Sequence, residues 1–143
     1  NENAVSFPQA FRKSNEIEFS FSGLKTALRY YLEKVGRNGT KVLLSDIAAS
    51  YQRSIVEILA NKLQMAVMKS GINTIVLAGG VAANNRLRME VQEVLSNCKL
   101  FFPESKYCTD NGAMVAFLGE IYMKKNSITS DNFTTAPNLS LKN

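Results

Sequence analysis

The stretch TIVLAGGVAANN, residues 74–85, gives the strongest indication of the fold. It opens with a short β-branched run between polar residues and glycines, which is typical of a buried parallel strand. Gly79 and Gly80 follow at once, and Asn84 or Asn85 can cap a helix. Glycines let a ligand approach the backbone closely, and the start of a helix offers free N–H groups to an anion. The stretch therefore predicts a strand, a turn and a helix, with a candidate anion site at the turn.

A plainer interpretation of the same residues stays open. A strand that enters a helix needs a tight turn, and Gly79-Gly80 with an Asn84 cap supplies one without any ligand. The turn is not a dinucleotide fingerprint, because the third glycine of that motif is absent.

Hydrophobic periodicity predicts the other elements. Ile17, Phe19 and Phe21 alternate with polar residues, which predicts a strand that Gly23 ends. A second short strand is expected at residues 99–102, before Pro103. Apolar residues spaced three and four apart predict helices at residues 24–35, ended by Gly36; 45–70, capped by Ser45 and ended by Gly71; 85–95; and from Thr109 or Asp110 to about 122.

The balance of helices and strands suggests the fold class. Three short strands cannot cover this many apolar helix faces, so we expect a helix-rich part of an α/β layer structure that takes further strands from elsewhere. Residues 1–125 are expected to form one portion, and the Asn-, Ser- and Thr-rich residues 126–143 a polar C-terminal tail.

Composition excludes several function classes. The 143 residues contain no histidine, so a His-based zinc site, a Ser-His-Asp triad and a Cys-His dyad cannot form within this chain. Cys98 and Cys108 are too few for a disulfide scaffold, which suggests a reducing cytoplasm. No segment reaches the roughly 18 apolar residues of a membrane helix, and no signal peptide is visible. The net charge of +5 permits an anionic ligand or RNA without requiring one.

Asp110, in CTDNGAMVA (residues 108–116), is the second candidate site residue. A carboxylate after a strand and loop can bind a metal or substrate at the sheet edge where ligands of α/β proteins gather, or it can cap the helix. The cap is the simpler interpretation.

Three basic residues and both cysteines have ordinary explanations beside functional ones. Lys25, Arg86 and Arg88 could contact an anion or RNA, although exposed charges on helices explain them equally. Cys98 and Cys108 have no cationic neighbour in sequence and are expected to be buried thiols.

Taken together, FSFSGLKTAL (19–28), LAGGVAANNRLR (77–88) and CTDNGAMVA closely resemble the C-terminal part of the TsaD/Gcp family of tRNA adenosine threonylcarbamoyltransferases. The resemblance implies an actin-like, Hsp70-like, sugar-kinase-like fold of two α/β lobes. It implies transfer of a threonylcarbamoyl group from threonylcarbamoyl-adenylate to a tRNA adenosine beside the anticodon, with accessory subunits as further partners. It also implies that Gly79 and Gly80 belong to the nucleotide turn, that Asn84 contacts the adenylate, and that Asp110 binds one divalent metal, iron or alternatively zinc.

The departures from the family pattern shape the remaining expectations. The two histidines of the family's metal site and its two phosphate loops are absent, so the chain looks like the C-terminal portion of a longer protein. We expect it to be inactive and metal-free alone. The alternatives are part of a kinase from the same superfamily and a non-catalytic partner module. A lobe without its neighbour should expose apolar surface near Phe7, Phe11, Phe19 and Phe21, and should self-associate.

Overall fold

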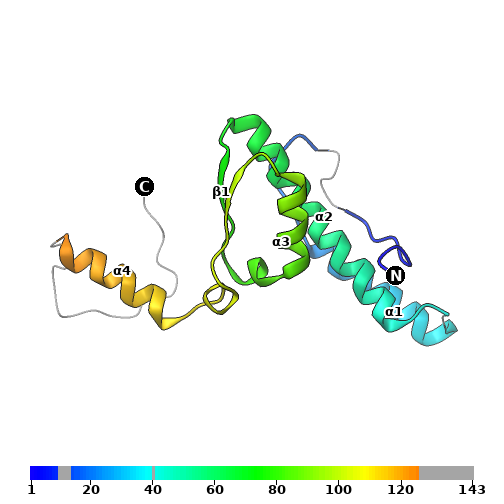
Figure 1. The fold of residues 1–143 in the computed structure, drawn as a ribbon. Helices are drawn as coiled ribbons and strands as arrows, with labels where there is room; N and C mark the ends of the chain where they lie inside the picture. Colours follow the sequence, from blue (N-terminus) through cyan, green and yellow to red (C-terminus); the bar gives the residue numbers. More distant parts are fainter. Residues whose placement is uncertain (10–13, 40, 126–143) are drawn as a thin grey trace. The chain divides into compact units, whose positions relative to one another are not determined.

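The computed structural model describes residues 1–9, 14–39 and 41–125 (Figure 1). They fall into two units that meet between Thr109 and Asp110, and the described parts of these units, within residues 1–109 and 110–125, are treated separately. The first unit contains α1 (Ser22–Asn38), α2 (Leu44–Ser70), β1 (Thr74–Val76), η1 (Gly80–Ala83), α3 (Asn85–Val94), β2 (Lys99–Phe101) and η2 (Ser105–Tyr107), and the second contains α4 (Gly112–Lys124). No helix of these described segments is long and apolar enough to cross a membrane.

A small parallel sheet lies at the centre of the first unit. In the described residues it consists of β1 and β2, with Ile75 opposite Leu100, and α3 forms the crossover between them. Such a parallel pair needs a long connection, and a helix usually provides it. The mixture of helices with a small parallel sheet is compatible with the expected α/β class, and both strands lie where the sequence places them.

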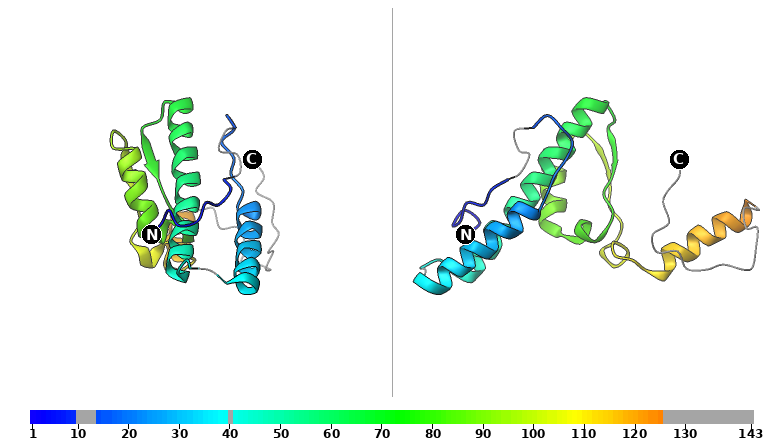
Figure 2. Two further views of the ribbon diagram at one scale, coloured as in Figure 1. Left: turned by 90° about the vertical axis from the view of Figure 1, so that its right-hand side faces the viewer. Right: turned by 180° about the vertical axis from the view of Figure 1, so that it is seen from behind.

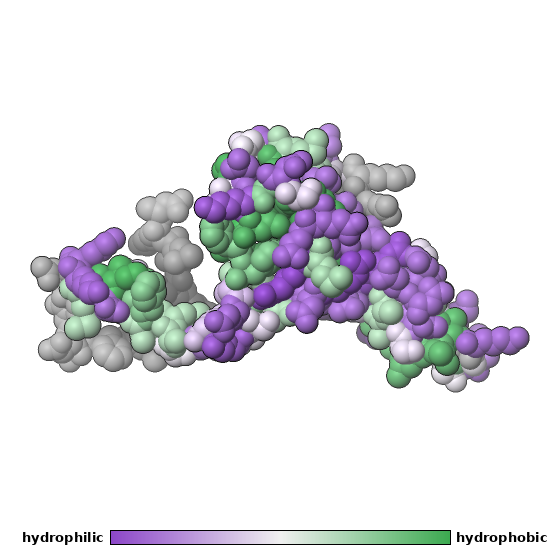
Figure 3. All heavy atoms as spheres, viewed as in Figure 1, coloured by the Kyte–Doolittle hydropathy of each residue, from purple (hydrophilic) through white to green (hydrophobic). Residues whose placement is uncertain are grey.

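One face of this sheet carries the main core. Ile75 is buried against α2 and α3, which lie side by side (Figures 1 and 2). Alternate residues of a strand point to opposite faces, and Val76 on the other face is 68% exposed. Hydrophobic side chains are accordingly visible at the surface beside the strands (Figure 3). The buried residues of this core are Val56, Ala60, Ile75, Leu87, Val91 and Leu95.

A second core joins α1 to α2. Phe7 lies in it with Leu24, Ile47 and Ile58, and its ring meets Tyr51 edge-on at 5.6 Å between centroids. Our expectation that Phe7 would lack partners is therefore wrong, because the N-terminal segment folds back over the two helices. Phe19 is half exposed, as expected, while Phe11 lies outside the described residues.

The strand predicted from Ile17, Phe19 and Phe21 is wrong. These residues form irregular chain that pairs with neither strand of the described sheet. Its carbonyl groups are bound by a lysine of α2 instead: the Lys62 ammonium donates to the Ser14 oxygen at 2.9 Å and to the Glu16 oxygen at 2.7 Å. We call residues 14–21 the strap.

Several helix ends differ from the sequence prediction. α1 continues through Gly36 to Asn38 and stops at Gly39, where φ is 70°. α2 begins one residue early, with Leu43 at the cap position and Ser45 inside the first turn. Gly71 ends α2 as predicted, in the left-handed conformation that favours glycine. A helix can start without a side-chain cap where packing fixes it. The predicted cap at Ser45 is therefore wrong.

We predict that Lys62→Met releases the strap. Lys62 is 3% exposed, so both of its charge-assisted bonds are shielded from water, and losing them should cost the strap about 2 kcal/mol of local stability. A glutamate-specific protease should then cut at Glu16 or Glu18 at least about tenfold faster. The control is Lys69→Met, because Lys69 is exposed yet binds the neighbouring Asn15 carbonyl. Equal cleavage of both variants would contradict the special role of Lys62.

Candidate functional site

The turn after β1 is built as a short backbone arch. Leu77 extends the strand ladder by donating to the Phe101 oxygen at 3.0 Å. Gly79 then reverses the chain with φ 89° and ψ 168°, a conformation that is essentially restricted to glycine. η1 follows, and the Ala82 amide donates to the Gly79 oxygen at 2.9 Å. The arch leads directly into the first turn of α3.

The two glycines serve different purposes. A methyl group at Gly79 would meet no atom within 4 Å, so only the positive φ requires glycine there. Gly80 has no such φ, and a methyl group there would lie 3.9 Å from the Thr109 side chain. The backbone of both residues is therefore open to a ligand, which is the property that the candidate anion site needs.

Asn84 is the cap of α3. Its Oδ1 accepts from the Leu87 amide at 3.2 Å and from Gln52 Nε2 at 3.5 Å. The capping interpretation is thus confirmed. Within the described residues the Nδ2 group of Asn84 has no hydrogen-bond partner. A ligand contact through Nδ2 is compatible with the cap and stays a prediction.

Asp110 is not the cap of α4, and Thr109 is not either. The cap is Asn111, whose side chain accepts from the Met114 amide at 3.0 Å before α4 begins at Gly112. Asp110 is the first residue of the second unit, and it is exposed and forms no ion pair with the described residues. Helix capping therefore does not explain why Asp110 is a carboxylate.

The residues present do not make a complete metal site. In the described ranges no three His, Cys, Asp or Glu side chains are arranged to hold an ion. Asp110 can supply one hard oxygen ligand, whereas iron and zinc sites of this kind need imidazole partners, and the sequence has no histidine.

The basic residues separate into two kinds. Lys25 is exposed, as the ordinary interpretation expects. Arg86 is partly buried, and it pairs with Glu90 at 2.8 Å along the same helix and with Glu2 at 3.7 Å. Arg88 is different, because it points into the fold and contacts Cys108, which is buried as predicted. Nothing in the local sequence distinguishes Arg88 from Arg86.

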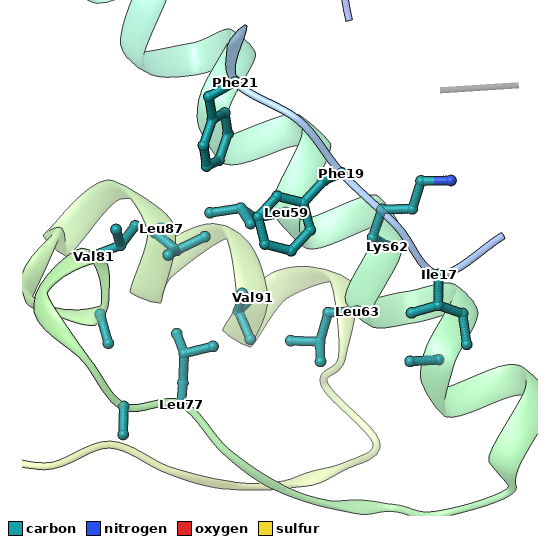
Figure 4. A pocket seen from close by; sticks show the side chains of 13 residues that line it. Ile17, Phe19, Phe21, Leu59, Lys62, Leu63, Leu77, Val81, Leu87 and Val91 are labelled. Atoms are coloured by element: carbon teal, nitrogen blue, oxygen red, sulfur yellow. The ribbon is translucent and has the colours of Figure 1, made fainter. Parts of the chain in front are cut away.

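An apolar cavity of about 340 Å³ borders the glycine turn (Figure 4). The strap forms one wall with Ile17, Phe19 and Phe21. The other walls come from α2, α3 and two pairs of residues on either side of the glycines, 77–78 and 81–82. Lys62 contributes its aliphatic stem, while its ammonium is directed away from the cavity towards the strap carbonyls (Figure 4). The sequence predicted neither the cavity nor the lysine.

Comparison with known proteins decides the family. A model of the TsaD family, described as tRNA N6-adenosine threonylcarbamoyltransferase, matches residues 1–117. The chain belongs to the TsaD family. The matched residues include the glycine turn, Asn84 and Asp110, so the resemblance inferred from three short motifs is confirmed.

TsaD relatives extend well beyond this chain. Proteins named tRNA N6-adenosine threonylcarbamoyltransferase from Thermosipho africanus and Thermosipho melanesiensis are 42% and 41% identical over 143 residues, 99% of this chain. A protein of the same name from Desulfotalea psychrophila is 43% identical over 124 residues, 83% of the chain. The chain spans 43%, 42% and 36% of the length of these three TsaD relatives.

The two glycines of the TsaD turn give a matched pair of variants. We predict that Gly79→Ala lowers the free energy of unfolding by about 1–3 kcal/mol, because alanine is strained at this φ and ψ. Gly80→Ala should change it by less than about 0.5 kcal/mol, since its methyl group makes an ordinary contact. Urea unfolding followed by circular dichroism measures both. Equal losses would contradict backbone strain at Gly79 as the reason for glycine there, because a methyl group meets no close neighbour at either position.

Proposed function

We propose that this chain is the C-terminal, nucleotide-binding part of an enzyme that transfers a threonylcarbamoyl group from threonylcarbamoyl-adenylate to a tRNA adenosine beside the anticodon. The family match over residues 1–117 carries the proposal. The open backbone at Gly79 and Gly80 supports it, because an adenylate phosphate needs close access to amide groups. The names of the relatives supply the transferred threonylcarbamoyl group and its acceptor, a tRNA adenosine.

The proposed setting is a two-lobed actin-like, Hsp70-like, sugar-kinase-like fold. In it, residues 1–125 form a helix-rich part of one lobe and residues 126–143 a polar tail. The exposed face of Val76 in the small sheet supports this view, since a sheet in an α/β fold normally has helices on both faces.

Each candidate residue has a distinct part in the proposal. Gly79 and Gly80 present backbone to the nucleotide, and Asn84 donates from Nδ2 to the adenylate while its Oδ1 caps α3. Asp110 provides one ligand of a divalent metal, iron or alternatively zinc. The remaining ligands come from outside these 143 residues, because the chain contains no histidine.

The proposed partners follow from the reaction. They are tRNA, threonylcarbamoyl-adenylate and the accessory subunits of a tRNA-modification complex, in the cytoplasm. The net charge of +5 is compatible with a tRNA ligand.

The test joins this chain to the part of the Thermosipho africanus relative that it does not cover. The joined protein, threonylcarbamoyl-adenylate and tRNA should yield threonylcarbamoyl-adenosine, and the 143-residue chain alone should yield none. Transfer by the chain alone would overturn the proposed division of the site. A folded joined protein that binds the adenylate and phosphorylates a substrate instead would favour the kinase alternative.

Asn84 allows the nucleotide role to be separated from the cap. Asn84→Ser keeps a capping oxygen and removes the Nδ2 donor, whereas Asn84→Ala removes both. In the joined protein we expect Asn84→Ser to weaken adenylate binding by about tenfold, the effect of one lost hydrogen bond of about 1–2 kcal/mol. Titration calorimetry measures affinity, and thermal unfolding checks the fold. Unchanged adenylate affinity in Asn84→Ser would mean that Asn84 only caps α3.

A further inference from the structure

The side chain of Arg88, on α3, contacts two other segments of the first unit, η1 and residues 102–108. Its Nε donates to the Ala82 oxygen of η1 at 2.6 Å. One terminal nitrogen donates to the Pro103 oxygen at 2.7 Å and lies 3.1 Å from Cys108 Sγ. The guanidinium also lies 5.5 Å from the centre of the Phe102 ring. A planar fork of five N–H donors is suited to contacts in several directions at once.

The surroundings of Arg88 differ from those of an ordinary surface arginine. Among the described residues it pairs with no carboxylate, so its charge is directed at backbone carbonyls. Charge-assisted bonds of this kind are about twice as strong as neutral ones. Arg86, two residues earlier on the same helix, forms ion pairs with Glu90 and Glu2 instead.

The contacts of Arg88 continue into the glycine turn. Ala82 is buried, and its amide donates to the Gly79 oxygen while its own oxygen accepts from Arg88. On the other side, the loop from Pro103 to Cys108 packs its 3₁₀ turn, η2, against η1. The Arg88 side chain therefore contacts both η1 and the 103–108 loop.

We propose that Arg88 is a positioning residue that makes the glycine turn, residues 79–83, and the 103–108 loop behave as one rigid body. A nucleotide at the turn would then bind to a backbone already fixed by Arg88. This consequence for the nucleotide rests on the proposed function, whereas the mechanical connection does not. Lysine cannot replace arginine here, because two different nitrogens of the guanidinium bind Ala82 and Pro103, whereas a lysine presents all its donors from one atom.

The two cysteines report on the connection in the 143-residue chain itself. In Arg88→Met and Arg88→Lys, a thiol reagent should modify the buried Cys108 at least about tenfold faster, because loosened contacts raise local opening. Cys98 packs against the main core and should react as before. Arg86→Met is the control and should change neither thiol. An unchanged Cys108 rate in either folded variant overturns the proposal.

Hydrogen exchange tests the same point without a variant. The amides of Ala82, Asn84 and Cys108 are each bonded within their own turn. If Arg88 joins the turns, these amides should exchange with a common opening constant in the unaltered chain, and divergent constants overturn the proposal.

In the joined protein, Arg88→Lys should also weaken threonylcarbamoyl-adenylate binding by about tenfold. Faster modification of Cys108 together with unchanged adenylate affinity would support the rigid body and contradict the proposed effect of Arg88 on nucleotide binding.

Discussion

Asp110→Asn is expected to remove the proposed metal from the joined protein and to abolish the proposed threonylcarbamoyl transfer. The substitution keeps the size of the side chain and removes its charge, and an amide is a much weaker ligand for a divalent cation than a carboxylate. Asp110 is exposed and is not the cap of α4, so in the metal-free 143-residue chain the substitution should leave thermal unfolding unchanged. Metal analysis of the purified protein, with a transfer assay, measures both effects, and we expect metal affinity to fall at least about a hundredfold.

Asn111→Ala is the matched control for Asp110→Asn. Asn111 caps α4 through the Met114 amide, so its loss should cost about 1 kcal/mol of helix stability while metal and transfer remain. The two variants thus distinguish the proposed metal-ligand role of Asp110 from the capping role of Asn111, a distinction that the sequence alone does not make. Full metal occupancy in Asp110→Asn would reject the ligand assignment.

The positions of the helices and of two strands could be predicted because their signals are local. Apolar spacing of three and four residues is set by helix geometry, and Gly71 ends α2 as its left-handed conformation requires. The caps were less predictable, because neighbouring residues such as Asp110 and Asn111 are both good caps. Only the position at which the backbone turns decides between them.

The strap shows why a correct periodicity can give a wrong element. Alternation at Ile17, Phe19 and Phe21 does place three apolar side chains on one side, where they line a cavity. It carries no information about whether a partner strand is present. In this chain the strap carbonyls are bound by Lys62, a contact across 46 residues of sequence that no local pattern encodes.

The candidate site divides in the same way. Gly79, Gly80 and Asn84 are close in sequence and form one turn, so their proximity was predictable. Arg88 reaches Pro103 and Cys108, which are 15 and 20 residues further along the chain. Its role depends on how β2 pairs with β1, and the sequence pattern of α3 cannot reveal it.

The 143-residue chain is expected to self-associate at micromolar concentration through α4. This helix has no buried side chain in the described structure, and Phe117 is 65% exposed. Hydrophobic side chains of α4 are visible at its surface (Figure 3). Monomers rarely expose apolar patches beyond a few hundred Å². The apolar side chains of α4 that are about half exposed or more are Met114, Val115, Phe117, Leu118, Tyr122 and Met123.

The double variant Val115→Lys with Phe117→Lys should therefore lower the sedimentation coefficient to that of a monomer, because two charges make burial of the helix between chains costly. Met68→Lys is the control, since Met68 is an exposed apolar residue of α2 outside this patch and its replacement should leave association unchanged. Sedimentation velocity over a concentration series distinguishes the outcomes. A strictly monomeric unaltered chain would mean that the apolar side of α4 is already covered within one molecule.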